Sequence, residues 1–183
     1  YGPITRTVRD GALFLDQVAG YHPADADSLP AVDYSYLDRL DEPLAPLRIA
    51  FSPNLGGFNV QSDVAREVEG AVNIFSELGH EVVEQNDTLP EMLMWWMQVG
   101  RFQALASMWD IYTERREDFS EPYVGGMDHA LTTQPSDFGE FGRLRAELNN
   151  QLWRLFDDFD LLMTPTMPME AIDAEGPIPR ELE

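Results

Sequence analysis

The chain contains no cysteine and no lysine, and each absence excludes a class of chemistry. Without Cys it can form no disulfide, no thiolate nucleophile, no Cys-ligated zinc site and no iron–sulfur cluster. Without Lys it can form no Schiff base, no P-loop lysine contact, and no catalytic dyad or triad that depends on a lysine amine. An enzyme of those kinds would have to obtain the missing group from outside these 183 residues.

Positive charge is scarce as well. The 12 basic residues, all of them Arg, stand against 33 Asp and Glu residues, which gives a formal net charge of −21. A field of that sign repels phosphate backbones and anionic lipid, so we expect neither nucleic acid nor membrane as a partner. No apolar run is long enough to cross a bilayer and no signal-peptide pattern is present, which favours a cytoplasmic protein. A salt-adapted source and a GC-rich genome both explain the composition, and the two remain open.

The hydrophobic share, 44% of the chain, is enough for the core of one domain or one large lobe. Apolar residues at helical spacing alternate with short apolar runs that end at turn formers. The predicted helices cover 8–19, 63–78, 91–118 and 138–157, and the predicted strands cover 47–51, 80–84 and 160–164.

The ends of these elements have recognisable signals. Thr7 and Ser62 are predicted N-caps, and Gly20 and Gly79 are predicted to end the same two helices. Pro and Gly between 119 and 137 predict a loop with about one helical turn. A strand, a helix and a strand between 47 and 84 form a βαβ unit, whose strands should be parallel. The sequence therefore predicts an α/β fold with a mixed or parallel β-sheet flanked by helices.

Side chains that commonly carry chemistry are scattered along the chain. Asp157, Asp158 and Asp160 straddle a helix end and a strand start, which favours a solvated corner over an acid/base or cation site. Gly56 and Gly57 lack both common phosphate-binding patterns, so we interpret them as a turn. The histidines lie alone in different segments without metal-ligand spacing, so we expect structural roles, no metal site and no cofactor. They are His22, His80 and His129.

The predicted helix 91–118 is rich in Met and Trp. Trp95 and Trp96 point in different directions on a helix, so one buried face cannot hold both, and Met94 lies beside them. Either the helix packs on two sides, or one side lines a hydrophobic substrate channel or an interface. Both interpretations remain open, and the three residues are candidate channel-lining residues.

Two stretches together resemble one family. Residues 2–20, GPITRTVRDGALFLDQVAG, followed by DADS at 25–28, resemble the "G-P-x-x-R-T-V-x-D-A-A-x-L-L-D-x-x-A-G" helix of amidase-signature enzymes. Residues 160–168, DLLMTPTMP, resemble their "D-x-L-x-T-P-T-x-P" strand and loop. The βαβ unit fits between these points, whereas 91–157 match only loosely. The resemblance implies the amidase-signature fold.

The resemblance also implies a Ser–Ser–Lys triad, in which a lysine activates a serine nucleophile through a second serine. In the family both serines and the lysine lie upstream of the "G-P-x-x-R-T-V" helix. Residues 1–183 would then be the C-terminal part of an amidase-signature domain, without its N-terminal catalytic half. No catalytic residue carries over to any position here, and the isolated chain should be inactive.

The residues of the family site that contact substrate, unlike the catalytic residues, have counterparts in this chain if the resemblance holds. The loop after the "T-P-T-x-P" strand faces the active-site cavity in the family, and open α/β sheets generally bind ligands beyond the carboxyl ends of their strands. The resemblance therefore implies a substrate-pocket wall made of Thr164, Pro165, Thr166 and Pro168. A proline-rich strand exit without ligand contact remains the alternative.

Three functions remain open at this point. The Trp- and Met-rich segment and the acid excess favour a stand-alone amidase for a small amide substrate. The alternatives are the glutaminase subunit of a tRNA-dependent amidotransferase and a naturally short, non-catalytic α/β binding or scaffold protein. A C-terminal part would expose apolar side chains where the missing catalytic half packs, and a homodimer could hide them. The expected exposed residues are Met94, Trp95 or Trp96, Trp109 and Trp153.

Overall fold

A computed structural model describes residues 2–174, so the proline-broken segment 176–183 lies outside the described residues. The chain divides into two compact units, Tyr1–Ala45 and Pro46–Glu183. No helix in the described part is both long and apolar enough to cross a membrane.

The first unit consists of α1 (Val8–Val18) and a long loop. The Thr7 hydroxyl accepts a hydrogen bond from the Asp10 amide at 3.2 Å, which confirms Thr7 as the N-cap. The helix ends at the expected place, where Gly20 has a φ of 144° that other residues rarely adopt.

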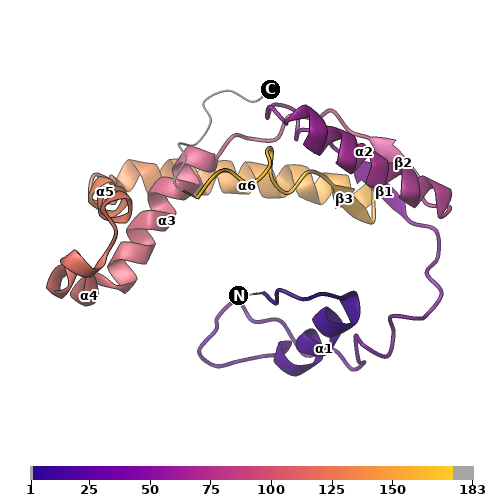
Figure 1. Ribbon diagram of the computed structural model, residues 1–183, viewed down its shortest axis with the longest axis horizontal. Coiled ribbons are helices and arrows are strands. Elements are labelled where there is room, and N and C mark those ends of the chain that lie inside the picture. Colours follow the sequence, from indigo (N-terminus) through magenta and orange to yellow (C-terminus); the bar gives the residue numbers. More distant parts are fainter. Residues whose placement is uncertain (1, 175–183) are drawn as a thin grey trace. The chain divides into compact units, whose positions relative to one another are not determined.

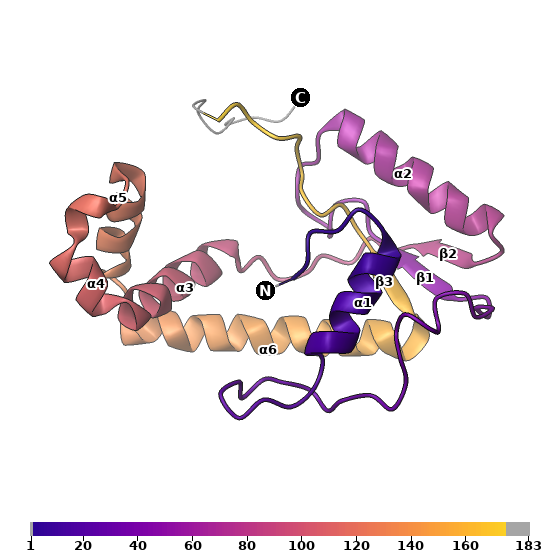
Figure 2. The ribbon, with the colours of Figure 1, turned by 60° about the horizontal axis from the view of Figure 1, so that its bottom comes forward.

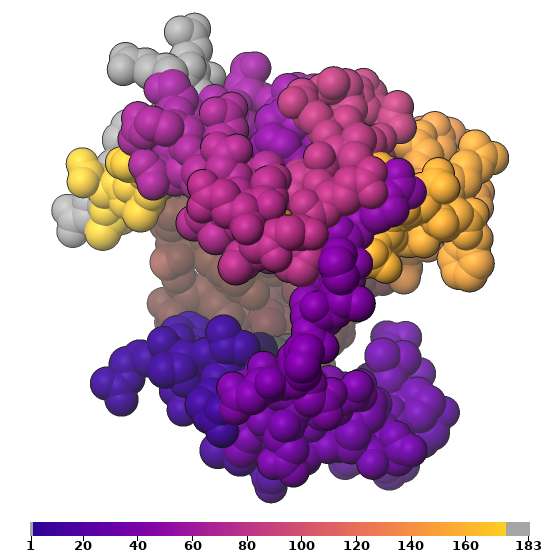
Figure 3. Space-filling view, turned by 90° about the vertical axis from the view of Figure 1, so that its right-hand side faces the viewer, coloured from indigo at the N-terminus to yellow at the C-terminus, as the bar shows by residue number. Residues whose placement is uncertain are grey.

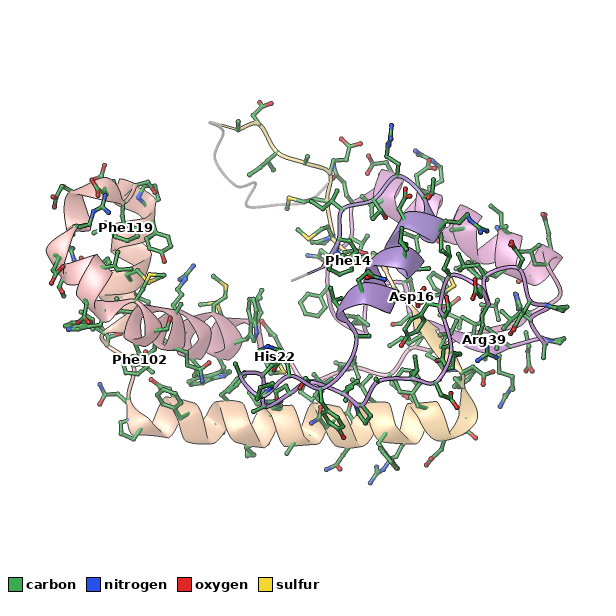
Figure 4. The ribbon with its side chains drawn as sticks, turned by 90° about the horizontal axis from the view of Figure 1, so that it is seen from below. Phe14, Asp16, His22, Arg39, Phe102 and Phe119 are labelled. Atoms are coloured by element: carbon green, nitrogen blue, oxygen red, sulfur yellow. The ribbon has the colours of Figure 1, made fainter. Side chains whose placement is uncertain are left out.

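Asp16 on α1 organises the loop that follows (Figure 4). Its carboxylate accepts hydrogen bonds from the Ser35 hydroxyl at 2.8 Å and from the amides of Tyr36 at 2.6 Å and Leu37 at 3.2 Å. Burial alone would raise the pKa of Asp16, but these hydrogen bonds lower it overall. The turn at 36–40 is therefore held against α1 by one side chain.

The second unit contains a three-stranded sheet of β1 (Arg48–Phe51), β2 (Glu81–Glu84) and β3 (Leu161–Met163). The strand order is β2-β1-β3 and both pairings are parallel, which confirms the βαβ prediction for β1 and β2. Because β1 lies in the centre, Ile49 and Ala50 are fully buried, whereas β2 at the edge begins and ends with exposed Glu residues.

Arg48 connects all three strands at the amino end of the sheet. Its backbone N–H donates to the Asp160 carboxylate and one guanidinium nitrogen donates to the Asp158 carbonyl, both at 2.8 Å. Its Nε donates to Glu81 at 3.1 Å. Asp158 and Asp160 therefore serve as hydrogen-bond acceptors at a structural corner. Within residues 2–174 no group of three or more His, Asp or Glu residues is placed to hold a metal ion.

The crossover helix of the βαβ unit is α2 (Ser62–Glu77), which packs against β2 (Figures 1 and 2). Ser62 was the expected N-cap, and this prediction is wrong. The cap position is Gln61, whose carbonyl accepts the first helical bond from Ala65 at 3.0 Å and whose side chain makes no capping bond. The Gln61 side chain instead accepts a hydrogen bond from the Glu170 amide at 3.1 Å. Beyond the helix, Gly79 has the positive φ, 93°, expected of a residue that ends it.

The prediction of a single helix over 91–118 is wrong, because the helix is interrupted there. The segment forms α3 (Leu93–Ser107), α4 (Trp109–Glu114) and a 3-10 turn at Arg116–Asp118. The prediction of a loop at 119–137 is also wrong, since α5 (Glu121–Ala130) occupies much of this segment. The last helix, α6 (Pro135–Asp158), begins three residues before its predicted start.

Packing explains these departures from the sequence pattern. The break lets Tyr112, only 2% exposed, join a core of Leu105, Met127 and Ala130, which brings α4 and α5 onto α3. We call α3, α4, the 3-10 turn and α5 together the helical lobe. Around this core, the Phe119 ring stacks on Tyr123 with ring centroids 5.3 Å apart (Figure 4).

A polar cluster closes the helical lobe. The Tyr112 hydroxyl donates to the Asp128 carboxylate at 2.9 Å and accepts a hydrogen bond from Arg116 at 2.6 Å, while Arg116 also pairs with Asp128. The hydrogen bonds from Arg116 and Tyr112 lower the pKa of Asp128. From the lobe, α6 runs the length of the unit to the sheet, where it leads into β3 (Figures 1 and 2).

Candidate functional site

The carboxyl ends of β1 and β3 meet at one edge of the sheet. The strands are parallel neighbours, and the Ser52 amide continues their ladder by donating to the Met163 carbonyl at 2.9 Å. The segments that leave the two strands therefore start side by side. In open α/β sheets this edge is where ligands bind.

These two segments and the start of α3 enclose a pocket of about 370 Å³. All four residues of the expected pocket wall line it, and they lie in the segment 164–168, which we call the pocket loop. Residues after β1 that were not expected also line it. Leu93, the first residue of α3, completes the lining. The lining residues are Asn54, Leu55, Phe58, Val60, Leu93, Thr164, Pro165, Thr166, Met167 and Pro168.

Among residues 2–174, none of those that line this pocket is charged. Only Asn54, Thr164 and Thr166 offer polar side-chain atoms, and the others are aliphatic, aromatic, thioether or proline groups. Such a surface suits a neutral, largely apolar group, because an ion placed there would lose hydration without gaining a partner.

The pocket loop is fastened to the start of α2. The Gln61 amide donates to the Pro168 carbonyl at 2.8 Å, and the Gln61 side chain accepts from the Glu170 amide. Beside these bonds, a hydrogen bond between the carboxyl groups of Asp63 and Glu170 lowers the pKa of Asp63 and raises that of Glu170.

A second part of the pocket lining belongs to a tight turn at 54–57, the pocket turn. The Asn54 carboxamide oxygen accepts from the Gly56 amide at 2.9 Å, and Leu55 and Gly56 have φ angles of 51° and 79°. The segment after β2 holds this turn from outside. Thr88 Oγ1 donates to the Gly56 carbonyl at 3.1 Å, and the Leu89 amide donates to the Leu55 carbonyl at 3.3 Å. The turn predicted at Gly56-Gly57 is confirmed.

Two buried hydroxyls lie where the strands end. Ser52, 4% exposed, and Thr164 have side-chain oxygens without a hydrogen-bond partner among the described residues. Thr164 also lines the pocket, whereas Ser52 does not. Buried hydroxyls of this kind are uncommon and are normally satisfied by water or by another group.

The expected channel residues lie elsewhere on α3. Met94 and Trp96 are exposed and Trp95 is half-buried, but none of the three lines this pocket, to which α3 contributes only Leu93. Their role in a channel stays a prediction. Two of the histidines have structural partners, because His22 Nδ1 accepts from the Ala24 amide and His80 Nδ1 accepts from the Leu47 amide.

A second hollow, of about 450 Å³, lies between the segment after β2 and the end of α6. Figure 3 shows this face, on which residues after β2, in pink, adjoin the C-terminal part of α6, in orange. Its lining includes Asp87, Arg154 and Asp158, so it carries charge of both signs. It contains none of the expected site residues.

Sequence reasoning missed the part of the lining that follows β1, together with Leu93 and Met167. A signal for the first group was present, because the rule that placed ligands beyond β3 applies equally to β1. Applying it required knowing that β1 and β3 are neighbours. No sequence signal distinguished Leu93 from the apolar residues that follow it.

Comparisons with known proteins agree with this architecture. A family profile described as Amidase matches residues 1–180. An acylamidase of Rhodococcus erythropolis is 30% identical over 174 residues, an alignment that covers 91% of this chain and 35% of that protein. A glutamyl-tRNA(Gln) amidotransferase subunit from Caldanaerobacter subterraneus is 24% identical over 195 residues, covering 93% of this chain and 40% of that protein.

Among solved structures, a bacterial aryl acylamidase described as one of the amidase signature enzymes has a TM-score of 0.82 to this chain. The two are 26% identical, and the match covers 99% of this chain and 40% of the other. The chain thus spans about two fifths or less of the length of these three proteins.

Proposed function

The chain belongs to the amidase signature family, and we propose that it supplies the substrate-pocket wall and part of the sheet of an enzyme that hydrolyses amide C–N bonds. The observation that carries this proposal is the pocket in which the pocket loop meets the pocket turn. Its uncharged lining suits the apolar part of a small amide substrate. The expectation that Thr164, Pro165, Thr166 and Pro168 contact substrate remains part of this proposal.

We further propose that the catalytic residues come from outside these 183 residues, from an N-terminal catalytic part to which this chain is the C-terminal part. Two observations support this. The chain has no lysine for a Ser–Ser–Lys triad, and it spans only 35% of the acylamidase that it resembles. No residue of the chain is therefore assigned a catalytic role, and a cytoplasmic location stays a prediction.

The glutaminase alternative has support from the amidotransferase subunits among the relatives. Free glutamine carries an ammonium and a carboxylate group, however, and the pocket lining offers no charge to pair with either. The apolar lining therefore favours an amidase for uncharged amides. A naturally short binding or scaffold protein would be supported if the pocket proved to bind no amide.

The first test combines turnover with binding. The 183-residue chain should release no aniline from acetanilide and no ammonia from benzamide above a heat-inactivated control, because no lysine is available to activate a serine. In methyl-labelled protein, acetanilide should still shift the methyl resonances of Val60 and Leu93, while L-glutamine should not. Thr166→Asp, which puts a charge into the lining, should weaken acetanilide binding about tenfold.

Each outcome of this test has a distinct meaning. Turnover by the chain would contradict the proposal that the catalytic residues come from outside it. Methyl shifts with L-glutamine but not with acetanilide would favour the glutaminase alternative. An absence of shifts with both ligands would overturn the pocket proposal.

Self-association is a separate proposal. The expected exposed set is largely confirmed, because Met94, Trp96, Trp109 and Trp153 are all exposed, Trp153 to 75%. Side chains of this size are costly to leave in water, and a homodimer would hide part of them. Light scattering should give a mass above that of one chain, and Trp153→Gln should lower it. A strict monomer at all concentrations would contradict the homodimer.

A further inference from the structure

The unusual backbone of the pocket lies at Leu55. Its φ of 51° falls in the left-handed region, which a bulky side chain rarely adopts because Cβ crowds the following carbonyl. Among the described residues it is the only one other than glycine with a positive φ. Gly79 adopts a positive φ without this penalty, and no atom lies near the position of a Cβ there, so the chain uses glycine where backbone conformation alone decides.

The strain at Leu55 is imposed by its surroundings. The Asn54 side chain closes the turn through the Gly56 amide at 2.9 Å, and the Gly57 and Phe58 amides both donate to the Asn54 carbonyl, at 3.2 and 2.9 Å. From the other side the Leu89 amide donates to the Leu55 carbonyl. The backbone of Leu55 is therefore fixed on both flanks and cannot relax into an ordinary turn.

Strained residues persist only when the surrounding structure over-determines them, and they cluster at active sites and ligand clamps. Asn or Gly would fit this φ at lower cost, and neither would present a large apolar group. The Leu55 side chain is half-buried and lines the uncharged pocket together with the pocket loop. We propose that Leu55 is a specificity-determining residue, held in a strained conformation so that its side chain contacts the apolar part of the amide. This inference rests on the proposed function of the pocket.

The test compares substitution by Asn at two positions of one lining. Leu55→Asn removes the apolar group and adopts the left-handed region more readily, so strain relief offsets the lost packing. Its melting midpoint should equal that of the wild type or rise by about 2 °C. Val60→Asn removes an apolar group of the same lining from a half-buried residue whose φ is not positive, so no strain is relieved. Its midpoint should fall.

Binding provides the second readout. Acetanilide affinity, followed through the Val60 methyl resonances, should drop about fivefold in Leu55→Asn. Leu55→Met keeps both the apolar group and the strain, so it should match the wild type in affinity and in midpoint. Leu131→Asn makes the same chemical change at a half-exposed leucine outside the pocket with a φ of −66°, and should leave affinity unchanged.

The outcomes separate this inference from the function on which it rests. If acetanilide binds the wild type but Leu55→Asn binds it equally well, the inference is overturned and the pocket proposal stands. If Leu55→Asn loses as much stability as Val60→Asn, Leu55 is an ordinary packing residue and the inference is overturned again. If acetanilide fails to bind the wild type, both proposals fall together. Retained stability with weakened binding in Leu55→Asn alone, rescued by Leu55→Met, supports the inference.

Discussion

Gly56→Ala should destabilise the chain severely and abolish ligand binding in the pocket. The added Cβ would lie 2.4 Å from Thr88 Cα, 2.6 Å from the Asp87 carbonyl oxygen and 2.7 Å from the Thr88 nitrogen. All three atoms belong to the backbone, so no side-chain rotation relieves the overlap. The φ of 79° adds the cost of a left-handed conformation for a residue with a side chain.

The two costs can be combined into an expected size. Overpacking of a close contact costs about 1–3 kcal/mol, and a left-handed non-glycine residue costs about 1–3 kcal/mol. A sum of about 2–6 kcal/mol is a large part of the stability of a typical domain, and lowers the melting midpoint on the order of 10 °C. Thermal melting followed by circular dichroism measures it.

Gly57→Ala is the matched control for this experiment. The neighbouring glycine has no atom within 4 Å of an added Cβ, and its φ lies outside the left-handed region. The control should therefore change the unfolding free energy by no more than about 0.5 kcal/mol. Equal midpoints for Gly56→Ala and Gly57→Ala would show that the pocket turn does not pack against the Thr88 backbone as described.

The sheet was predictable because its signals are local. Each strand is a short apolar run that ends at a turn former, and the helix between the first two strands fixes their parallel pairing. The pocket loop was predictable for a related reason, since resemblance and the rule for strand ends both selected 164–168. Its partner, the pocket turn, was not, because it depends on β1 and β3 being neighbours although more than 100 residues separate them.

The helical lobe shows where local signals mislead. Pro122, Gly125 and Gly126 suggested a loop, yet Pro122 lies in the first turn of α5, where a missing N–H costs nothing. Gly126 packs beside the Arg101 side chain, which would lie at an ordinary contact distance of 3.7 Å from an added Cβ. Burial of Tyr112 and Met127 outweighs the low helix propensity of these residues. Such burial depends on tertiary contacts that no short window of sequence contains.

Leu105→Ala should therefore unfold the helical lobe before the sheet. Leu105 is 1% exposed at the centre of the lobe core, beside Tyr112, Met127 and Ala130. Truncating a buried leucine to alanine costs about 2–5 kcal/mol, because the lost apolar contacts leave a cavity. The residues that this cavity touches belong to α3, α4 and α5, whereas β1 has a separate set of buried residues, Ile49 and Ala50.

Hydrogen exchange can distinguish local from global loss. In Leu105→Ala, amides of α4 and α5 should lose protection on the order of 100-fold, corresponding to about 2–3 kcal/mol, while β1 amides should lose less. Leu131→Ala, at a leucine that is half exposed, should change protection little. Equal loss of protection in α5 and β1 would contradict independent unfolding of the lobe, and would mean that α3 and α6 couple the lobe to the sheet as one cooperative unit. In that case the lobe would also stabilise the pocket, because α3 begins at Leu93 in the pocket lining and ends in the lobe core.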